Sequence, residues 1–242
     1  GATEGTVKNG TAEAIADMTD TLRKEIKTAK SVDDAVLKVV RASFKRTTAV
    51  RFEGNNYSDE WVVEAKKRGL LNLRRAPDGL AQLVTKDAKT LFKSTGILTE
   101  IELESRYHVR LERYIKDILI EQHTLQQMVD TQVLPAAYAY VGQIAAAAGQ
   151  GASAGINMQP LVDAANATTK LLTTLQKKRA ELAKVIAKGE GLHDDPIAQG
   201  AYLTSTGCDT MNEVRDAVDA LELVVGDEFW PVPRYREMLF PV

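Results

Sequence analysis

"TEIELESRYHVRLERYIKDILIEQHTLQQMVDTQVLP", residues Thr99 to Pro135, is the longest stretch of the chain with a single periodicity. Apolar side chains recur every three or four positions along it, as on one face of an amphipathic helix. The face is traced by Tyr107, Leu111, Tyr114, Ile118, Leu125, Met128 or Val129, and Val133. Thr99 and Glu102 have the spacing of a capping box. The stretch therefore predicts a long helix from Glu100 that kinks or ends at Pro135, and the alanine-rich stretch "PAAYAYVGQIAAAAG" could continue it beyond a kink.

The same helical spacing continues on both sides of this stretch, with plausible capping residues such as Ser31 and Ser58. Further helices are expected at about residues 11–27, 31–47, 58–68, 80–84, 88–92, 158–186 and 209–225. The segment after the last of them, "FWPVPRYREMLFPV", has two prolines that favour an extended conformation. The fold class predicted is all-α: an antiparallel bundle of long helices, with shorter N-terminal helices and an extended C-terminal tail.

Composition divides the chain into three parts. Residues 1–10 are expected to be a flexible or tag-derived start, residues 11–98 short helices around a junction loop, and residues 99–242 the long-helix bundle with its docking tail. The glycine-rich residues 149–157 are expected to be a linker between two helices, since a phosphate-binding loop would need a preceding strand. The start, "GATEGTVKNG", lacks both an initiator methionine and an apolar signal core, which is expected of a processed end or a cut inside a longer chain.

Charge and cysteine content narrow the classes of partner. The 31 basic and 33 acidic side chains are interleaved, so no field of one sign indicates a nucleic-acid or anionic membrane partner. The nearly uncharged stretch from Val133 to Met158 is dominated by alanine and broken by glycine, which makes a poor membrane span. Cys208 is the single cysteine, so no intrachain disulfide is possible and a reducing compartment such as the cytoplasm is expected.

The histidines do not predict a metal site. His108 and His123 share one predicted helix about 22 Å apart and cannot bind the same ion. His193 precedes Asp194 and Asp195, and this combination favours a solvated loop over a cation site. We predict no catalytic, cofactor-binding or metal-binding residue in this chain.

"RFEGNNYSDEW", residues 51–61, is the one stretch that breaks the helical rhythm. Its candidate site residues are Glu53, Gly54, Asn55, Asn56, Tyr57 and Trp61. They offer a charge, two amides and a phenol for binding. A structural interpretation is favoured, in which a turn packs Phe52, Tyr57 and Trp61 against the bundle.

Several of these strings together resemble a known family. "RFEGNNYSDEWVVEAKKRGLLNLRRAPDGL", then "ELESRY" and "LPAA" in order, and finally "FWPVPRYREMLF", are similar to the C-terminal part of type III glutamine synthetases. The resemblance covers most of the chain and is weakest between Gly142 and Gly207. It implies a parent enzyme that joins ammonia to glutamate with ATP and Mg or Mn, and that assembles into stacked rings.

The resemblance also implies that the catalytic residues lie outside this chain. The family's metal-binding glutamates and ATP contacts belong to upstream segments, so the chain alone is expected to be inactive and to contact its own catalytic domain and identical subunits. Its compartment would be the cytoplasm, or a plastid in an alga. The alternative is a free-standing helical interaction or oligomerisation module with no enzyme activity.

Overall fold

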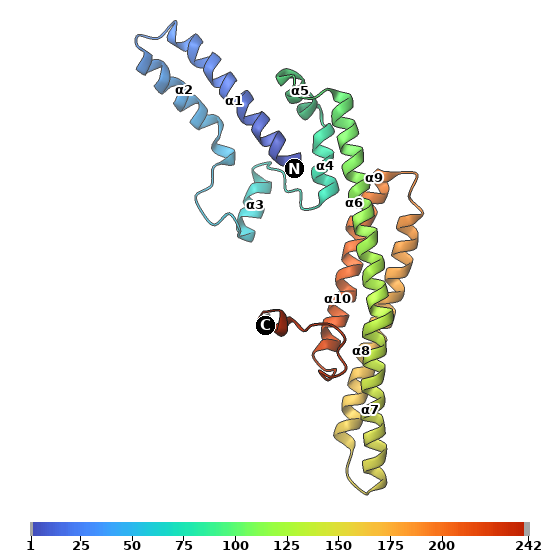
Figure 1. Cartoon of the computed structure of the whole chain (residues 1–242). Coiled ribbons are helices and arrows are strands. Elements are labelled where there is room, and N and C mark those ends of the chain that lie inside the picture. The colour runs from blue at the N-terminus through green and yellow to red at the C-terminus, as the bar shows by residue number, and fades with distance from the viewer. Residues whose placement is uncertain (1, 240–242) are drawn as a thin grey trace. The chain divides into compact units, whose positions relative to one another are not determined.

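The computed structural model describes residues 2–239, with side chains from residue 10 onward (Figure 1). Every regular element among these residues is helical, which confirms the all-α prediction. None of the described helices is long and apolar enough for a membrane-spanning segment. The chain divides into two compact units, the first ending at Arg110 and the second beginning at Leu111. We describe each unit by itself.

The first unit is built from short helices and one hairpin. Its elements are α1 (Ala2–Ile26), α2 (Val32–Arg46), the 3-10 turn η1 (Thr48–Val50), α3 (Asp59–Lys67), α4 (Ala76–Ala81), the 3-10 turn η2 (Gln82–Val84), α5 (Lys86–Thr95) and the first turns of α6 (Glu100–Met128). The hairpin of α1 and α2 is joined by the turn that follows Ile26. Helix α1 begins at Ala2, so the described part of the segment expected to be a flexible or tag-derived start, residues 1–10, is helical. Gly5 and Gly10 weaken a helix without ending it.

The predicted caps are confirmed. The Ser31 hydroxyl accepts a hydrogen bond from the Asp34 N–H, and the Ser58 hydroxyl accepts one from the Trp61 N–H. At the start of α6, the Thr99 N–H donates to the Glu102 carboxylate and the Glu102 N–H donates to the Thr99 hydroxyl. These bonds satisfy donors that a helix start leaves unpaired, which is why local sequence fixed these boundaries.

The second unit contains a three-helix core. Its elements are the rest of α6, the π turn η3 (Val129–Val133), α7 (Leu134–Ser153), α8 (Gln159–Glu190), α9 (Pro196–Tyr202), the π turn η4 (Leu203–Gly207), α10 (Cys208–Glu222) and α11 (Tyr235–Met238). In Figure 1, α8 runs back beside α7, and α10 lies beside α8. The buried core consists of Val129, Val133, Leu134, Ala137, Leu172, Leu175, Leu182, Ile186, Val214, Ala217, Leu221, Val225 and Trp230. The last helix of the bundle was expected from about Asp209, but the chain is already helical from Pro196.

The long helix neither ends nor breaks at Pro135. It passes through η3 and continues as α7, where proline occupies the first turn. The Leu134 N–H donates to the Val129 carbonyl, five residues earlier. A proline ring crowds the carbonyl four residues before it and supplies no N–H, and a wider π turn accommodates both defects. Arg179 of α8 holds the turn with two hydrogen bonds to the Asp130 carboxylate, at 2.7 and 2.5 Å, and this carboxylate raises the pKa of the guanidinium.

The linker expected over residues 149–157 is shorter than predicted. Helix α7 runs to Ser153, and the turn begins at Ala154, with Gly155 in the left-handed region at a φ of 75°. Gly151 lies inside helix α7. A larger residue would not fit there, because a Cβ at this position would lie 2.3 Å from the Met158 sulfur. This glycine therefore provides space for packing, whereas Gly155 provides the backbone conformation that ends a helix.

One buried amide in this core lacks a hydrogen bond. Gln122 of α6 is fully buried, and neither its nitrogen nor its oxygen has a partner among the described residues. A Cβ on Gly207 of η4 would come within 2.3 Å of the amide nitrogen, so the glycine makes room for it. An unpaired buried amide is costly because it has lost its bonds to water.

We therefore expect Gln122→Met to raise the free energy of unfolding, by about 1 kcal/mol. Methionine has a similar length and no polar group that needs a partner. The matched control is Gln199→Met, because Gln199 is also buried but donates to the Gly189 carbonyl at 3.0 Å. This control should lower the free energy of unfolding. Urea denaturation of both variants measures the difference, and equal destabilisation by both would contradict the prediction.

Candidate functional site

The junction loop, residues 51–61, is organised around one arginine. Phe52 and Trp61 stack with ring centroids 4.3 Å apart, and the guanidinium of Arg68 lies 5.9 and 5.5 Å from the two centroids. Arg68 also donates to the Arg51 carbonyl at 2.7 Å and to the Glu64 carboxylate at 2.7 Å. Its hydrogen bond lowers the pKa of the Glu64 carboxyl. The loop thus closes on the last turn of α3 through cation–π and hydrogen-bond contacts.

The structure separates the candidate residues of this loop. Trp61 stacks on Phe52, whereas the side chain of Tyr57 is 99% exposed, so the prediction that Tyr57 packs is wrong. The Asn55 side chain accepts a hydrogen bond from the Tyr57 N–H at 3.0 Å and forms a tight turn that turns the phenol outward. Glu53 and Asn56 are also exposed, and a Cβ on Gly54 would touch the Phe52 ring at 2.7 Å. The two aromatic rings at the ends of the loop therefore pack together, while the residues at its tip are exposed. The candidate side chains do not point toward a common binding position.

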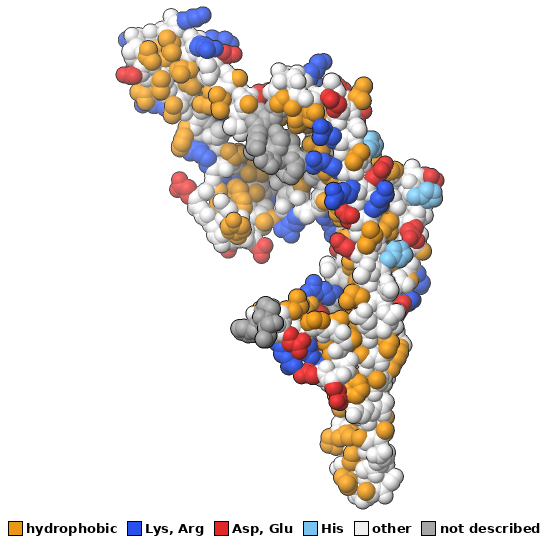
Figure 2. Space-filling model, viewed as in Figure 1, with side chains coloured by type: hydrophobic (Ala, Val, Ile, Leu, Met, Phe, Trp, Pro, Cys, Tyr) orange, Lys and Arg blue, Asp and Glu red, His pale blue; other side chains and the backbone are white. Residues whose placement is uncertain are grey.

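The first unit has more exposed large hydrophobic side chains than buried ones. Its buried hydrophobic side chains are Ala35, Val39, Ala65, Phe92, Leu103 and Tyr107. Its exposed ones are Ile15, Met18, Ile26, Val32, Val36, Leu37, Val40, Phe44, Val50, Tyr57, Val63, Leu71, Leu73, Ile97, Ile101 and Val109. Figure 2 shows hydrophobic side chains gathered over the α1–α2 hairpin. Contiguous exposed apolar surface of this kind marks an interaction site.

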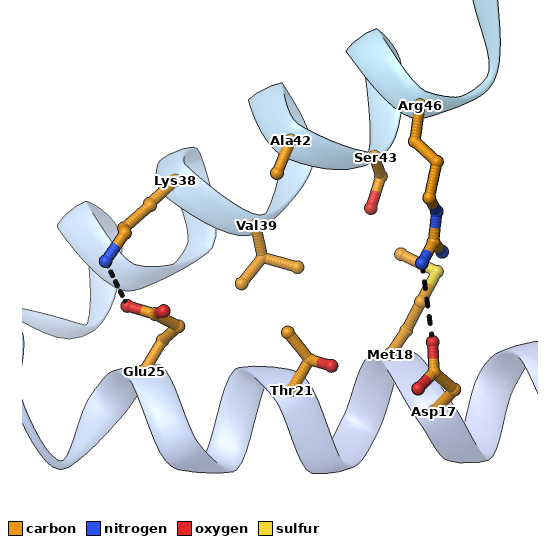
Figure 3. Close-up of a pocket in the computed structure, with 9 residues that line it drawn as sticks. All are labelled: Asp17, Met18, Thr21, Glu25, Lys38, Val39, Ala42, Ser43 and Arg46. Carbon is orange, nitrogen blue, oxygen red and sulfur yellow. Dashed lines mark hydrogen bonds and ion pairs between the residues drawn. The ribbon is translucent and has the colours of Figure 1, made fainter.

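Two adjoining grooves follow the contact between α1 and α2. The first, drawn in Figure 3, has polar edges, where Lys38 pairs with Glu25 at 2.7 Å and Arg46 pairs with Asp17 at 3.8 Å. The second groove, which we call the hairpin groove, encloses about 300 Å³. Its lining is almost entirely apolar: Ile15, Met18, Thr19, Leu22, Val36, Val39 and Val40. It has the form of a slot for an apolar partner.

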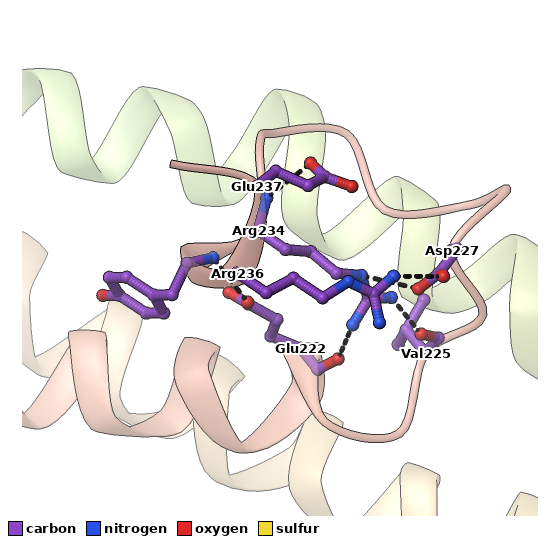
Figure 4. Close-up of polar contacts among 7 residues, drawn as sticks. Glu222, Val225, Asp227, Arg234, Arg236 and Glu237 are labelled. Atoms are coloured by element: carbon purple, nitrogen blue, oxygen red, sulfur yellow. Dashed lines mark hydrogen bonds and ion pairs between the residues drawn. The ribbon is translucent and has the colours of Figure 1, made fainter. Parts of the chain in front are cut away.

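The second unit ends in a tail held by Arg234. This residue is buried, and its guanidinium donates to the carbonyls of Glu222 and Val225, the latter at 2.6 Å (Figure 4). It also pairs with Asp227 at 2.7 Å. The carbonyls lie at the C-terminal end of α10, where a helix leaves acceptors unpaired and attracts cations. We call these contacts the tail clamp.

Asp227 makes the tail clamp sensitive to acid. A hydrogen bond from Arg236, helped by the charges of both arginines, lowers the pKa of the Asp227 carboxyl below its usual value. A carboxyl with a lowered pKa in the folded state stabilises the fold above its unfolded pKa, about 4, and loses that contribution as the pH falls through the folded pKa. We expect wild type to be more stable than Asp227→Asn at pH 7 and the gap to close in acid. Thermal melts of both proteins from pH 7 to pH 2.5 test this, and a gap that persists at pH 2.5 would contradict it.

The described residues bring together no group of three or more histidine, cysteine or carboxylate side chains suited to a metal ion. His123 contacts Glu190 of α8 at 2.9 Å, and His193 lies 3.5 Å from Asp194. Asp195 accepts hydrogen bonds from the N–H groups of the first turn of α9 and is its N-cap. These contacts of His123, His193 and Asp195 position helices and side chains, and they do not form a binding site.

Sequence reasoning missed both arginines, Arg68 and Arg234, that organise the loop and the tail. Their partners are mostly backbone carbonyls, which leave no signal in the residue types around them. The only sequence signal was the concentration of arginine with proline and aromatic residues in the tail.

Comparison with known proteins gives one consistent result. Residues 35–151 match the family described as the glutamine synthetase C-terminal domain. A glutamine synthetase of Butyrivibrio fibrisolvens is 33% identical over an alignment that covers 85% of this chain and 29% of that protein. A type-3 glutamine synthetase of Dictyostelium discoideum is 31% identical, with 95% of this chain and 32% of that protein covered. A glutamine synthetase of Bacteroides fragilis is 27% identical over 86% of the chain and 29% of the protein. The chain therefore spans about a third of the length of these relatives.

Proposed function

The chain belongs to the glutamine synthetases, of which it carries the C-terminal domain, and from this premise we propose that it is the helical scaffold of the enzyme and supplies no catalytic group. The parent would join ammonia to glutamate with ATP and Mg or Mn, in the cytoplasm or a plastid. Its catalytic domain would lie in the part of the relatives that this chain does not cover. The family match argues against the alternative of a free-standing helical module with no enzyme parent.

The observation that carries the proposal is the contrast between the two units. The second unit has a continuous buried core, whereas the first leaves most of its large apolar side chains in contact with solvent. At about 25 cal/mol for each Å² of apolar surface, covering such a face stabilises a complex substantially. We infer that the catalytic domain covers the first unit, with the hairpin groove as the principal contact.

The second unit takes a different role in the proposal. Since its core is complete within one chain, it is available for contacts between identical subunits of an oligomer. Such contacts would join subunits without a catalytic group of this domain. The two roles can be tested separately because they use different units.

A ligase assay tests the catalytic part of the proposal. We expect these 242 residues alone, supplied with glutamate, ammonia, ATP and Mg or Mn, to form no glutamine above the protein-free blank. Phosphoryl transfer of this kind needs several carboxylates held around metal ions on a rigid scaffold. The full-length enzyme under the same conditions is the positive control. Glutamine formation by the 242-residue chain at the rate of the full-length enzyme would refute the scaffold role.

A further inference from the structure

The end of the helical hairpin formed by α7 and α8 reaches beyond the core. Val141 and Leu171 are the last residues of the two helices, toward the hairpin turn, that pack against the core of the second unit. Residues 142–170, which we call the arm, continue beyond them as two helices joined at Gly155. Figure 1 shows α7 and α8 extending past α10 at this end. The arm therefore has faces that no third helix of the described chain covers.

The arm is almost free of charge. Its only charged side chains are Asp163 and Lys170, and residues 131–162 contain none. Figure 2 shows only hydrophobic and uncharged side chains on the visible face at the end of the arm. Helix formation does not require this absence of charge, because helix α8 carries Lys177, Lys178 and Arg179 further along. A helix face exposed to solvent is normally charged, so this composition indicates a covered surface.

The arm also has an open apolar groove. It encloses about 620 Å³, and most of its lining is small or apolar, including Ala145, Ala148, Ala152, Ile156 and Val162, with the amides of Asn157, Gln159 and Asn166 as its polar part. Ile156 is 61% exposed and Val162 40% exposed. Small side chains allow a further helix to approach closely. Two hairpins that pack face to face would form a four-helix bundle, in which each helix has two neighbours.

The positions of the two charged side chains of the arm indicate which partner would cover its groove. Asp163 and Lys170 are seven residues apart, which is two turns, so they lie on one face of α8 with Asn166 between them. Neither makes an ion pair within the described chain, and Asp163 accepts only from the neutral Gln159 side chain, at 2.8 Å. A two-fold axis at Asn166 would bring each Asp163 opposite the Lys170 of the other copy. In an isologous contact, residue i meets j and j meets i, and opposite charges placed symmetrically about the axis satisfy this rule.

We propose that the arm binds the arm of a second copy of this chain, antiparallel, in a four-helix bundle whose register is set by two Asp163–Lys170 contacts. Asn166 lies near the axis, where a polar side chain favours one register over others. The inference specifies one of the subunit contacts proposed above. It rests on residues of the second unit alone, so it can fail while the docking of the first unit holds.

A charge exchange tests the proposal. Sedimentation velocity over a range of concentrations gives the dimer dissociation constant of the 242-residue chain. All proteins carry Val36→Asp and Val40→Asp, which removes association through the hairpin groove. Asp163→Lys and Lys170→Asp should each raise the dissociation constant by at least about tenfold, because each places like charges opposite each other. The double variant should return to within about threefold of its parent. A monomeric parent protein, or a double variant no tighter than the single variants, would overturn the proposal.

Disulfide trapping tests the antiparallel arrangement directly. In a Cys208→Ser background, Asn166→Cys places thiols near the two-fold axis and should form a covalent dimer under mild oxidation. The control is Ser153→Cys at the end of the arm, because an antiparallel pair holds those thiols far beyond the Cα separation of about 7 Å that a disulfide allows. If Ser153→Cys forms the dimer and Asn166→Cys does not, the arms associate end to end and the proposed register is wrong.

Discussion

Replacing Val36 and Val40 by aspartate in the proposed parent enzyme is expected to lower its glutamine-forming activity by more than about tenfold, since charges at the centre of an apolar interface cost several kcal/mol. Both side chains line the hairpin groove on α2, one turn apart, and are 38% and 50% exposed in the described chain. In the proposed complex they would be covered by the catalytic domain. Two carboxylates there would have to lose water without a partner.

The same exposure supplies an internal control. Because both valines are already partly exposed, the isolated 242-residue chain should tolerate the substitutions, and its melting temperature should change little. Arg41→Asp, at an exposed position of α2 outside both grooves, controls for the added negative charge. Activity of the full-length enzyme, its molar mass in solution and the melt of the isolated chain are the three measurements. Full activity and normal assembly in the Val36→Asp, Val40→Asp enzyme would show that the hairpin groove is not the contact.

Removing Arg234 should produce a large loss of stability in the second unit. Arg234→Met keeps much of the side-chain length but removes every donor, so it strands the Glu222 and Val225 carbonyls and leaves Asp227 without its buried partner. We expect a loss of about 2–4 kcal/mol in the free energy of unfolding. The tail carries Trp230, which is part of the core, so a released tail also exposes the indole. Fluorescence of this tryptophan should then shift to the red at denaturant concentrations that leave the helices intact.

Arg236→Met is the matched control for Arg234. Both arginines pair with Asp227, but the Arg236 side chain is 63% exposed and that of Arg234 is 11% exposed. An exposed ion pair contributes little because water already solvates both charges. The control should be close to wild type in urea denaturation. Equal losses in the two variants would mean that the charge on Asp227, and not the buried carbonyl contacts, holds the tail.

Local chemistry explains what the sequence could predict. The caps at Ser31, Ser58 and Thr99 depend on residues three positions apart, so they were readable without knowledge of the fold. Apolar periodicity likewise predicted the long helices of the bundle and therefore the fold class.

The errors have non-local causes. Pro135 was expected to kink or end a helix, and the expected end is wrong: the helix continues through η3 into α7, held by Asp130 and by an arginine of α8 that is 49 residues away in sequence. Tyr57 was expected to pack, but its side chain is exposed. Whether a tyrosine is buried depends on the surfaces that surround it, and the residues next to it in the sequence do not reveal these surfaces. Arg68 and Arg234 were missed because backbone carbonyls can be offered by any residue type.

The π turn η3 also determines the direction in which each side chain of α7 points. Each residue of an α-helix advances the helix by about 100°, and a π turn takes up one residue more than an α turn. Without that additional residue, α7 would leave the turn rotated by more than a quarter of a revolution, and Ala145 and Ala148 would face a different direction. One residue in Val129–Val133 therefore determines which side chains of α7 face the groove of the arm, and the hydrogen bonds between Arg179 and Asp130 hold the π turn that contains this residue.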